Sequence, residues 1–312
     1  MHVTFRQLRL FLALAETGSV TGAARALHVT QPTASMQLRE VAEAVGVPLY
    51  EVVARRMHLT DAGVELARTA RTMVAEWEAF SQKVDAMKGL TRGLLKVSVV
   101  STAKYFMPRL LGQFCERHPE IDISLEVLNR DGVVARLREN RDDLYIMSMP
   151  PAELELEDRV FMPNPIVAIA AADHPLARRR RLVLNDLREQ PFILRERGSG
   201  TRMAVDAHFR RARFVPRVRL ELGSNEAIRE AVAGRLGLAV LSRHALGEDP
   251  SRLGLAVLPV QGLPIASSWH VVWPRGKRPS PIAEVFRRHL EPPAGLAGGA
   301  AGGAARAATR VR

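Results

Sequence analysis

The stretch SVTGAARALHVTQPTASMQLREVAEAVG, residues 19–46, contains two short helical patterns separated by a turn. Ser19 and Thr30 are favourable N-cap residues for the two helices. Pro32 is tolerated in the first turn of the second helix, because the amide that proline lacks has no partner inside a helix there. Gly46 is a typical residue after the end of a helix. Two helices joined by a tight turn predict a helix-turn-helix unit.

The second of these helices keeps a polar face that a core helix does not need. Leu38, Val41 and Val45 fall on its apolar side and are expected to pack against the other helices. The polar side is predicted to enter the major groove of DNA, where it meets base edges and phosphates; a merely solvated helix face is the alternative. Two short extended runs around residues 55 and 56 predict a β-wing that reaches the DNA backbone or minor groove. The predicted DNA-contacting residues are Gln31, Pro32, Thr33, Ser35, Met36, Arg39, Arg55 and Arg56.

Helical patterns also flank this unit. Residues 5–16 have apolar side chains at helical spacing and predict a first helix with one buried face. After Thr60 and Asp61, which can cap a helix, apolar residues recur at alternating intervals of four and three over three repeats. Such a seam needs a partner, and a second copy of the same helix is favoured over packing against the chain's own later part. The predicted dimerisation residues are Leu66, Ala70, Met73, Trp77, Phe80, Val84 and Met87.

The formal net charge of +12 indicates an anionic partner, for which nucleic acid is the usual candidate. Residues 1–60 carry only six Arg against four Glu, a net charge of +2. Much of the excess lies instead in residues 177–182, residues 210–214 and the C-terminal tail. Charge therefore supports DNA binding weakly, and a solvated basic surface explains these runs equally well.

Beyond a hinge-like break at residues 88–93, strand patterns alternate with helical patterns. The helices are expected at about 104–117, 131–139, 202–213 and 225–233. This alternation predicts parallel sheets, and there are enough strands for two of them. The Gly/Ala-rich residues 293–312 lack material for a core and are expected to be disordered.

Three junctions between a strand and a helix are candidates for binding a small anion. Ligands of such folds bind beyond the carboxyl ends of the strands, where glycines admit an anion to the backbone and helix amides point toward it. Helix capping alone is the alternative at each junction. The predicted effector-binding residues are Ser101, Thr102, Lys104, Gly198, Ser199, Thr201, Arg202, Ser224 and Asn225.

The sequence lacks the features of enzymes, of metal- or disulfide-containing proteins and of membrane proteins. The chain has no nucleophile-elbow, Walker, dinucleotide-binding or zinc-protease motif, so neither an enzyme nor a bound cofactor is expected. The single Cys115 excludes an internal disulfide and a cysteine-based zinc site, and no metal site is expected. The chain has no long apolar run and no signal-peptide pattern, so we expect a cytoplasmic protein without a membrane partner.

Residues 5–63 resemble the helix-turn-helix and wing of the LysR-type transcriptional regulators almost position by position, and the resemblance extends to about Glu291. It departs at Val41 and Ala42, where a leucine-glutamate pair is common, and at Val52, where arginine is common. The stretches STAKYFMPRLLGQFCERHPEI, RLRENRDDLYIM, FILRERGSGTR and GSNEAIREAV are similar to the subgroup that controls Calvin-cycle (RuBisCO) operons. That resemblance implies a two-lobed domain, like periplasmic binding proteins, that senses sugar bisphosphates, phosphoenolpyruvate, ATP or NADPH.

We therefore predict an α/β regulator with a winged helix-turn-helix over 1–61, a linker helix over 62–90 and an effector domain over 91–292. Lobe I is expected at about 93–163 and 268–292, and lobe II at about 164–267. The expected assembly is a homodimer or homotetramer on double-stranded promoter DNA, whose bending changes when an anionic metabolite closes the lobes. Because Ala266 and Ser267 replace the arginines usual in the subgroup, a regulator of sulphur or nitrogen assimilation is the alternative. A solute-binding protein is a more remote alternative.

Overall fold

The computed structural model describes residues 2–53, 56–87 and 92–291, and within these the side chains of Arg56, Ala86 and Met87 are left undescribed. The predicted disordered tail, 293–312, lies outside the described residues. The chain divides into two compact units, one mainly of residues up to Thr91 and one mainly of residues from Arg92 onward.

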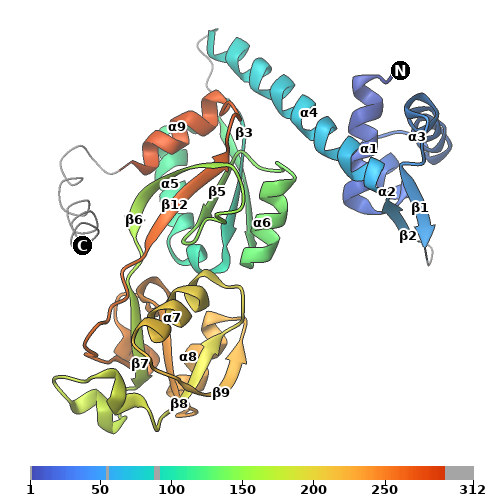
Figure 1. The fold of residues 1–312 in the computed structure, drawn as a ribbon. Helices are drawn as coiled ribbons and strands as arrows, with labels where there is room; N and C mark the ends of the chain where they lie inside the picture. Colours follow the sequence, from blue (N-terminus) through green and yellow to red (C-terminus); the bar gives the residue numbers. More distant parts are fainter. Residues whose placement is uncertain (1, 54–55, 88–91, 292–312) are drawn as a thin grey trace, which may run out of the picture. The chain divides into compact units, whose positions relative to one another are not determined.

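The first unit begins with three helices, α1 (Phe5–Thr17), α2 (Val20–Ala26) and α3 (Gln31–Val45) (Figure 1). Helix α1 starts at a capping box between Thr4 and Gln7 and ends at Gly18, whose φ of 63° suits glycine. Ser19 and Thr30 cap α2 and α3 as their sequence context predicts. Their inner faces form one core with α1. Its fully buried members include Phe11, Ala23, Ala34, Leu38 and Val41.

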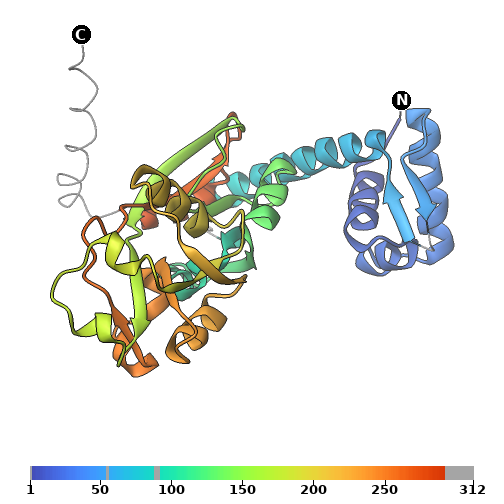
Figure 2. The same cartoon turned by 60° about the horizontal axis from the view of Figure 1, so that its bottom comes forward.

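A two-stranded antiparallel hairpin, β1 (Tyr50–Val53) and β2 (Arg56–Leu59), follows α3. The backbone N–H of Met57 donates to the carbonyl of Gly18 at 3.2 Å, which ties the hairpin to the turn between α1 and α2. The long helix α4 (Asp61–Met87) comes next, and its buried Ala67 and Ala70 join the core of the three helices. Figure 2 gives a second view of the hairpin beside these helices.

The second unit contains two five-stranded sheets. The first sheet has the order β4-β3-β5-β12-β6. Its strands are β3 (Gly93–Val100), β4 (Ile121–Leu128), β5 (Leu144–Met147), β6 (Leu156–Pro163) and β12 (Ser268–Pro274). Helices α5 (Met107–Arg117) and α9 (Pro281–Leu290) contribute to one of its cores, and α6 (Arg130–Arg138) contributes to another (Figure 1). We call this sheet and its helices lobe I.

The second sheet has the order β11-β7-β10-β8-β9. Its strands are β7 (Ile166–Ala171), β8 (Pro191–Arg195), β9 (Arg217–Leu222), β10 (Leu238–Ser242) and β11 (Leu255–Val257). Alternate residues of the strands feed two cores, so that α7 (Gly200–Arg211) packs with one set and α8 (Asn225–Ala233) with the other. We call this part lobe II. Short 3₁₀ helices complete the unit at Ser101–Tyr105 (η1), Pro175–Arg178 (η2), Leu184–Leu187 (η3), Arg243–Leu246 (η4) and Pro250–Leu253 (η5).

The expectation of parallel sheets is only partly right, because both sheets are mixed. Strands β3, β4 and β5 are parallel, as are β8, β9 and β10, but β12 runs antiparallel to β5 and β6, and β7 runs antiparallel to β10 and β11. The chain passes from lobe I to lobe II between β6 and β7, and returns between β11 and β12. The two crossing segments pair at Asn164 with Ser267 and at Ile166 with Ile265. Because β6 leads out of lobe I and β12 leads back into it, these two neighbouring strands run in opposite directions. The same holds in lobe II for β7, which leads in, and β11, which leads out.

Candidate functional site

Helix α3 presents the polar face that the sequence predicts. Thr30 accepts a hydrogen bond from the backbone N–H of Thr33 at 3.4 Å, which fixes where the helix starts. The small buried Ala34 and the buried Leu38 hold α3 on the core, so the residues between them point outward. Gln31, Pro32, Met36 and Arg39 are exposed, and Thr33 and Ser35 are half-buried. Gln31, Pro32, Ser35, Met36 and Arg39 line one shallow surface groove together with Glu40 and Glu43.

The wing is described only in part. Its strands keep a regular register from the pair Tyr50 and Leu59 to the pair Val53 and Arg56. Arg55 lies outside the described residues, and of Arg56 only the backbone position in β2 is described. Both arginines therefore stay predictions as phosphate contacts.

Helix α4 carries an apolar stripe that its own unit leaves exposed. Of the predicted dimerisation residues, Ala70 is buried in the helical core, and Leu66 and Val84 are half-buried. Met73, Trp77 and Phe80 expose 50%, 60% and 55% of their surface. The rings of Phe5, Trp77 and Phe80 form a chain, in which the Trp77 centroid lies 6.0 Å from that of Phe5 and 5.7 Å from that of Phe80. The structure does not describe the side chain of Met87.

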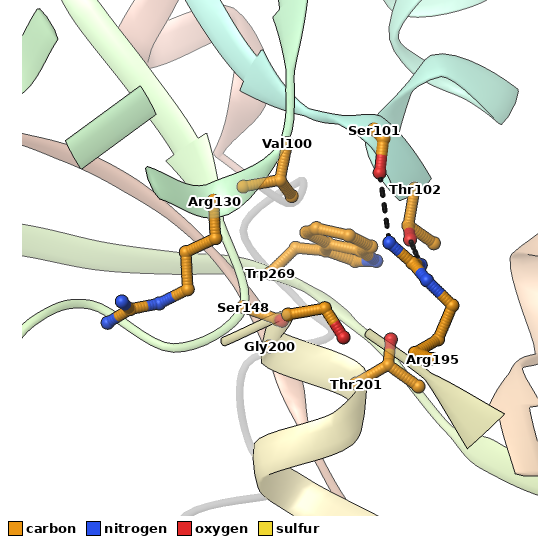
Figure 3. Close-up of a pocket in the computed structure, with 10 residues that line it drawn as sticks. Val100, Ser101, Thr102, Arg130, Ser148, Arg195, Gly200, Thr201 and Trp269 are labelled. Carbon is orange, nitrogen blue, oxygen red and sulfur yellow. Dashed lines mark hydrogen bonds between the residues drawn. The ribbon is translucent and has the colours of Figure 1, made fainter. Parts of the chain in front are cut away.

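A narrow pocket with a free volume of about 10 Å³ lies between lobes I and II (Figure 3). Four of the predicted effector residues line it: Ser101, Thr102, Ser199 and Thr201. The first two begin η1 directly after β3, and the other two begin α7 shortly after β8. The carboxyl ends of two parallel strands, one from each lobe, therefore supply these hydroxyl groups.

The other predicted effector residues do not line this pocket. Arg202 turns its guanidinium to Asp206 and Glu221, at 2.9 Å from each, and to the carbonyl of Arg195. These contacts hold the start of α7 to strands β8 and β9. Gly198 has a φ of 88°, which suits glycine and allows the tight turn before α7. Asn225 is buried and donates to Thr102 Oγ1 at 3.1 Å across the lobes, so it supports the pocket wall from behind.

Lys104 and Ser224 both contact Glu226, and the ion pair between Lys104 and Glu226 joins the two lobes. Lys104 Nζ lies 2.9 Å from the Glu226 carboxylate, Tyr105 Oη donates to it at 2.6 Å, and Ser224 Oγ donates at 2.9 Å. Burial raises the pKa of Glu226, but the hydrogen bonds from Tyr105 and Lys104 outweigh it and lower that pKa to about 2. Burial and the bond to Glu226 raise the pKa of Tyr105. Glu226 therefore stays ionised at physiological pH, and Tyr105 stays protonated and able to donate to it.

Six residues that line the pocket are absent from the list of predicted effector residues, although Gly200 belongs to a junction that the sequence singles out. They are Val100, Arg130, Ser148, Arg195, Gly200 and Trp269. Val100, Ser148 and Arg195 stand at the end of β3, after β5 and at the end of β8, so the rule about the carboxyl ends of parallel strands could have found them. Trp269 gave no local signal, because the return of β12 to lobe I places it there.

The two arginines of the pocket differ in what surrounds them. Arg195 is 3% exposed, and its five N–H donors are used by Glu196, Ser101, Thr102 and Asn225, so its charge is already balanced (Figure 3). Arg130 donates to the carbonyl of Met149 at 3.1 and 3.3 Å. Among the described residues it has no carboxylate partner, and in Figure 3 its guanidinium points away from the other labelled side chains.

The described part of the chain has no group of three or more metal-binding side chains. It also has no helix with the length and apolar character required to cross a bilayer. The geometry is therefore that of a small helical unit with an outward polar helix, and a two-lobed unit with a polar pocket at the junction of its lobes.

Comparison with known proteins identifies both units. The model for bacterial regulatory helix-turn-helix proteins of the lysR family matches residues 5–64, and the model for the LysR substrate binding domain matches residues 88–292. A RuBisCO operon transcriptional regulator of Acidithiobacillus ferrooxidans is 42% identical over 289 residues, which cover 93% of this chain and 94% of the relative.

Two solved structures of bacterial regulators are also similar to this chain. The regulatory domain of CcmR from Synechocystis PCC6803, in complex with 2-PG, is 46% identical with a TM-score of 0.61 and covers 64% of this chain and 96% of that one. A point mutant of full-length OxyR from Pseudomonas aeruginosa, 22% identical, covers 93% of this chain and 94% of that one with a TM-score of 0.74, which shows a common fold. The matched families and the RuBisCO operon relative are regulators and not enzymes. The chain belongs to the LysR family of bacterial transcriptional regulators.

Proposed function

We propose that this regulator binds the promoters of carbon-fixation genes through α3 and responds to a small phosphorylated or carboxylated metabolite bound between lobes I and II. The RuBisCO operon regulator that is 42% identical along nearly the whole chain supports the choice of genes. The CcmR regulatory domain, solved in complex with 2-PG, supports the choice of ligand, since it is 46% identical and corresponds to the unit that holds the pocket.

One side chain carries the ligand proposal. Trp269 is 1% exposed and lines the pocket, yet its Nε1–H finds no acceptor among the described residues. A buried N–H donor without a partner costs about 1–3 kcal/mol. In Figure 3 the indole lies among the lining hydroxyl groups. An oxygen of a bound anion would accept this hydrogen bond and remove the cost.

The rest of the pocket suits the same chemistry. Arg130 supplies positive charge, and Ser148 and Thr201 supply buried hydroxyl groups. The N-terminus of the twelve-residue helix α7 opens onto the pocket at Gly200 and favours negative charge there. The pocket is narrow at Gly200, where an added Cβ would lie 2.7 Å from Ser148 Oγ. The small free space favours a compact anion over a nucleotide.

Replacing Trp269 with Phe should weaken the binding of 2-PG about 10- to 100-fold, because a hydrogen bond to a charged group contributes about 1.5–3 kcal/mol. Isothermal titration calorimetry of the full chain measures this affinity. Trp273→Phe is the matched control, since Trp273 belongs to the same strand and lies under Arg287 without lining the pocket. Equal losses in both variants would show that the indole N–H does not contact the ligand.

Two measurements distinguish control of carbon-fixation genes from the alternative within the family, control of sulphur or nitrogen assimilation. A map of the promoters that the full chain occupies in cells should show carbon-fixation operons. The same calorimetry with sulphate in place of 2-PG should show no binding at millimolar concentration. Occupancy confined to sulphur or nitrogen operons would contradict the assignment of target genes and leave the DNA-binding function intact.

Base reading and phosphate binding by α3 can be distinguished by two substitutions. Gln31→Ala should reduce the preference for the promoter over random DNA by about 1–3 kcal/mol, because an amide side chain pairs with base edges. Arg39→Ala should weaken binding to both DNAs alike and reduce the dependence on salt by about one phosphate contact. Fluorescence anisotropy with a promoter and a scrambled duplex measures both effects. If both variants lose affinity equally for the two duplexes, Gln31 does not read bases.

We also propose that the stripe of Met73, Trp77 and Phe80 pairs with the same stripe of a second copy. The support is its exposure within the unit and its heptad spacing, which suits two helices packed side by side. A pair of chains carries two α3 helices, which matches two half-sites of a promoter. Pairing of such dimers into a tetramer remains a prediction from the family.

A further inference from the structure

Lobe II carries more than half of the protein's formal net charge. Residues 164–267 contain 17 Arg, no Lys and 10 Asp or Glu, so they carry a net charge of +7 out of +12. Neither the effector pocket nor α3 uses this excess. Five of these arginines are paired with carboxylates among the described residues, as Arg195 is with Glu196 and Arg235 is with Asp173. Half of the other twelve lie in two runs of sequence.

The two runs are residues 178–181 and residues 210–213, and their arginines are exposed. Arg178, Arg180, Arg210, Arg211 and Arg213 have no carboxylate partner among the described residues. Arg179 contacts Asp186 only at 3.5 Å. The negative end of α7 accounts for cations at Arg210 and Arg211, and Arg178 ends the short helix η2, but no helix C-terminus accounts for Arg180 and Arg181.

These runs lie close together in lobe II although about 30 residues separate them in the chain. Leu182, directly after the first run, and Phe209 and Phe214, around the second, are buried in the same core as Val260. Arg181 donates to Gln261 at 3.3 Å, and the ring of His208 lies against the neighbouring Gly262. The turn at 261–262 therefore bridges the two runs. We call Arg178, Arg180, Arg181, Arg210, Arg211 and Arg213 the arginine face.

We propose that the arginine face of lobe II binds the phosphate backbone of duplex DNA, namely the promoter DNA that flanks the sites held by α3. This inference rests on the proposed DNA-binding function. Guanidinium groups without partners are the usual ligands of phosphate oxygens. Promoter DNA held by the same molecule is also present at high effective concentration.

The surface chemistry favours DNA over an acidic protein. Protein interfaces are built around buried aromatic and apolar anchors, whereas nonspecific DNA surfaces consist of cations and need no such centre. Within 175–190 and 207–216, the large apolar side chains that are exposed are Val183 and Val215. The aromatic residues of this region, Phe209 and Phe214, are buried. The face thus offers charge without an apolar anchor.

The test compares two triple variants of the full chain. Arg180→Ala/Arg181→Ala/Arg211→Ala removes three charges from the arginine face. Arg109→Ala/Arg275→Ala/Arg278→Ala removes three charges from exposed arginines of lobe I and serves as the control. Each is titrated against a short duplex limited to the two half-sites and against a long promoter fragment with flanking DNA. The slope of log affinity against log salt concentration is measured for every pair.

We expect the arginine-face variant to reduce this slope by up to about 3 units on the long fragment, since each phosphate contact contributes about 0.9. Its slope on the short duplex and both slopes of the control should match the wild type. A corresponding Arg→Lys triple keeps the charge and should retain the wild-type slope, which would assign the effect to charge. An unchanged slope on the long fragment, or an equal reduction by the control, overturns the proposal. Failure to bind the short duplex at all would instead contradict the function of α3.

Discussion

Replacing Trp77 with Glu is expected to convert the regulator to monomers and to lower its affinity for a promoter with two half-sites about 10²- to 10⁴-fold. Trp77 exposes 60% of its surface within its own unit, so the folded chain can tolerate a charge there. Two facing stripes cannot tolerate it, because each copy would bury an unpaired carboxylate. The loss of affinity follows from the loss of the second α3 helix, since linked binding sites gain about this factor over single ones.

Light scattering after size-exclusion chromatography measures the mass, and fluorescence anisotropy measures the affinity. Thr72→Glu is the matched control, because it adds the same charge at an exposed position of α4 outside the heptad seam. A duplex with one half-site separates the two causes, since monomers and dimers should bind it with similar strength. A Trp77→Glu protein that keeps the mass and the affinity of the wild type would show that the stripe serves another purpose.

Gly63→Ala is expected to destabilise the helix-turn-helix unit by about 3 kcal/mol, near the upper end of the usual cost of overpacking. Gly63 lies in the first turn of α4, where its N–H donates to Thr60 Oγ1 at 3.1 Å. A Cβ on Gly63 would lie 1.9 Å from the carbonyl oxygen of Leu49, whose side chain is buried in the helical core. Since the obstacle is backbone, either the start of α4 or the segment before β1 must move.

Circular dichroism during thermal unfolding measures this effect, and the transition of the first unit should fall by more than about 10 °C. Gly112→Ala provides a control of opposite sign. Gly112 is exposed in the middle of α5, and nothing lies within 4 Å of an added Cβ. Alanine there should stabilise the second unit by about 0.5–1 kcal/mol through its higher helix propensity. If Gly63→Ala leaves the unfolding unchanged, the packing of α4 against Leu49 is looser than described.

Local sequence determined the helices of the first unit with little ambiguity. Caps such as Ser19 and Thr30, and the stop at Gly46, depend on neighbouring residues alone, and the structure has all three. The helix expected at 225–233 occurs with these bounds as α8. The helix expected from residue 104 begins only at Met107, because residues 101–105 form a 3₁₀ turn that places Ser101 and Thr102 in the pocket.

The tertiary structure decided the pocket. The sequence by itself showed which junctions between strands and helices are rich in hydroxyl groups and positive charge. It did not show that Arg202 points into lobe II, that Arg195 is neutralised by Glu196, or that Trp269 arrives from a strand more than 60 residues after α7 begins. Capping and periodicity are interactions over a few residues, whereas a pocket between lobes depends on where the chain crosses and returns, and only the assembled sheets specify that.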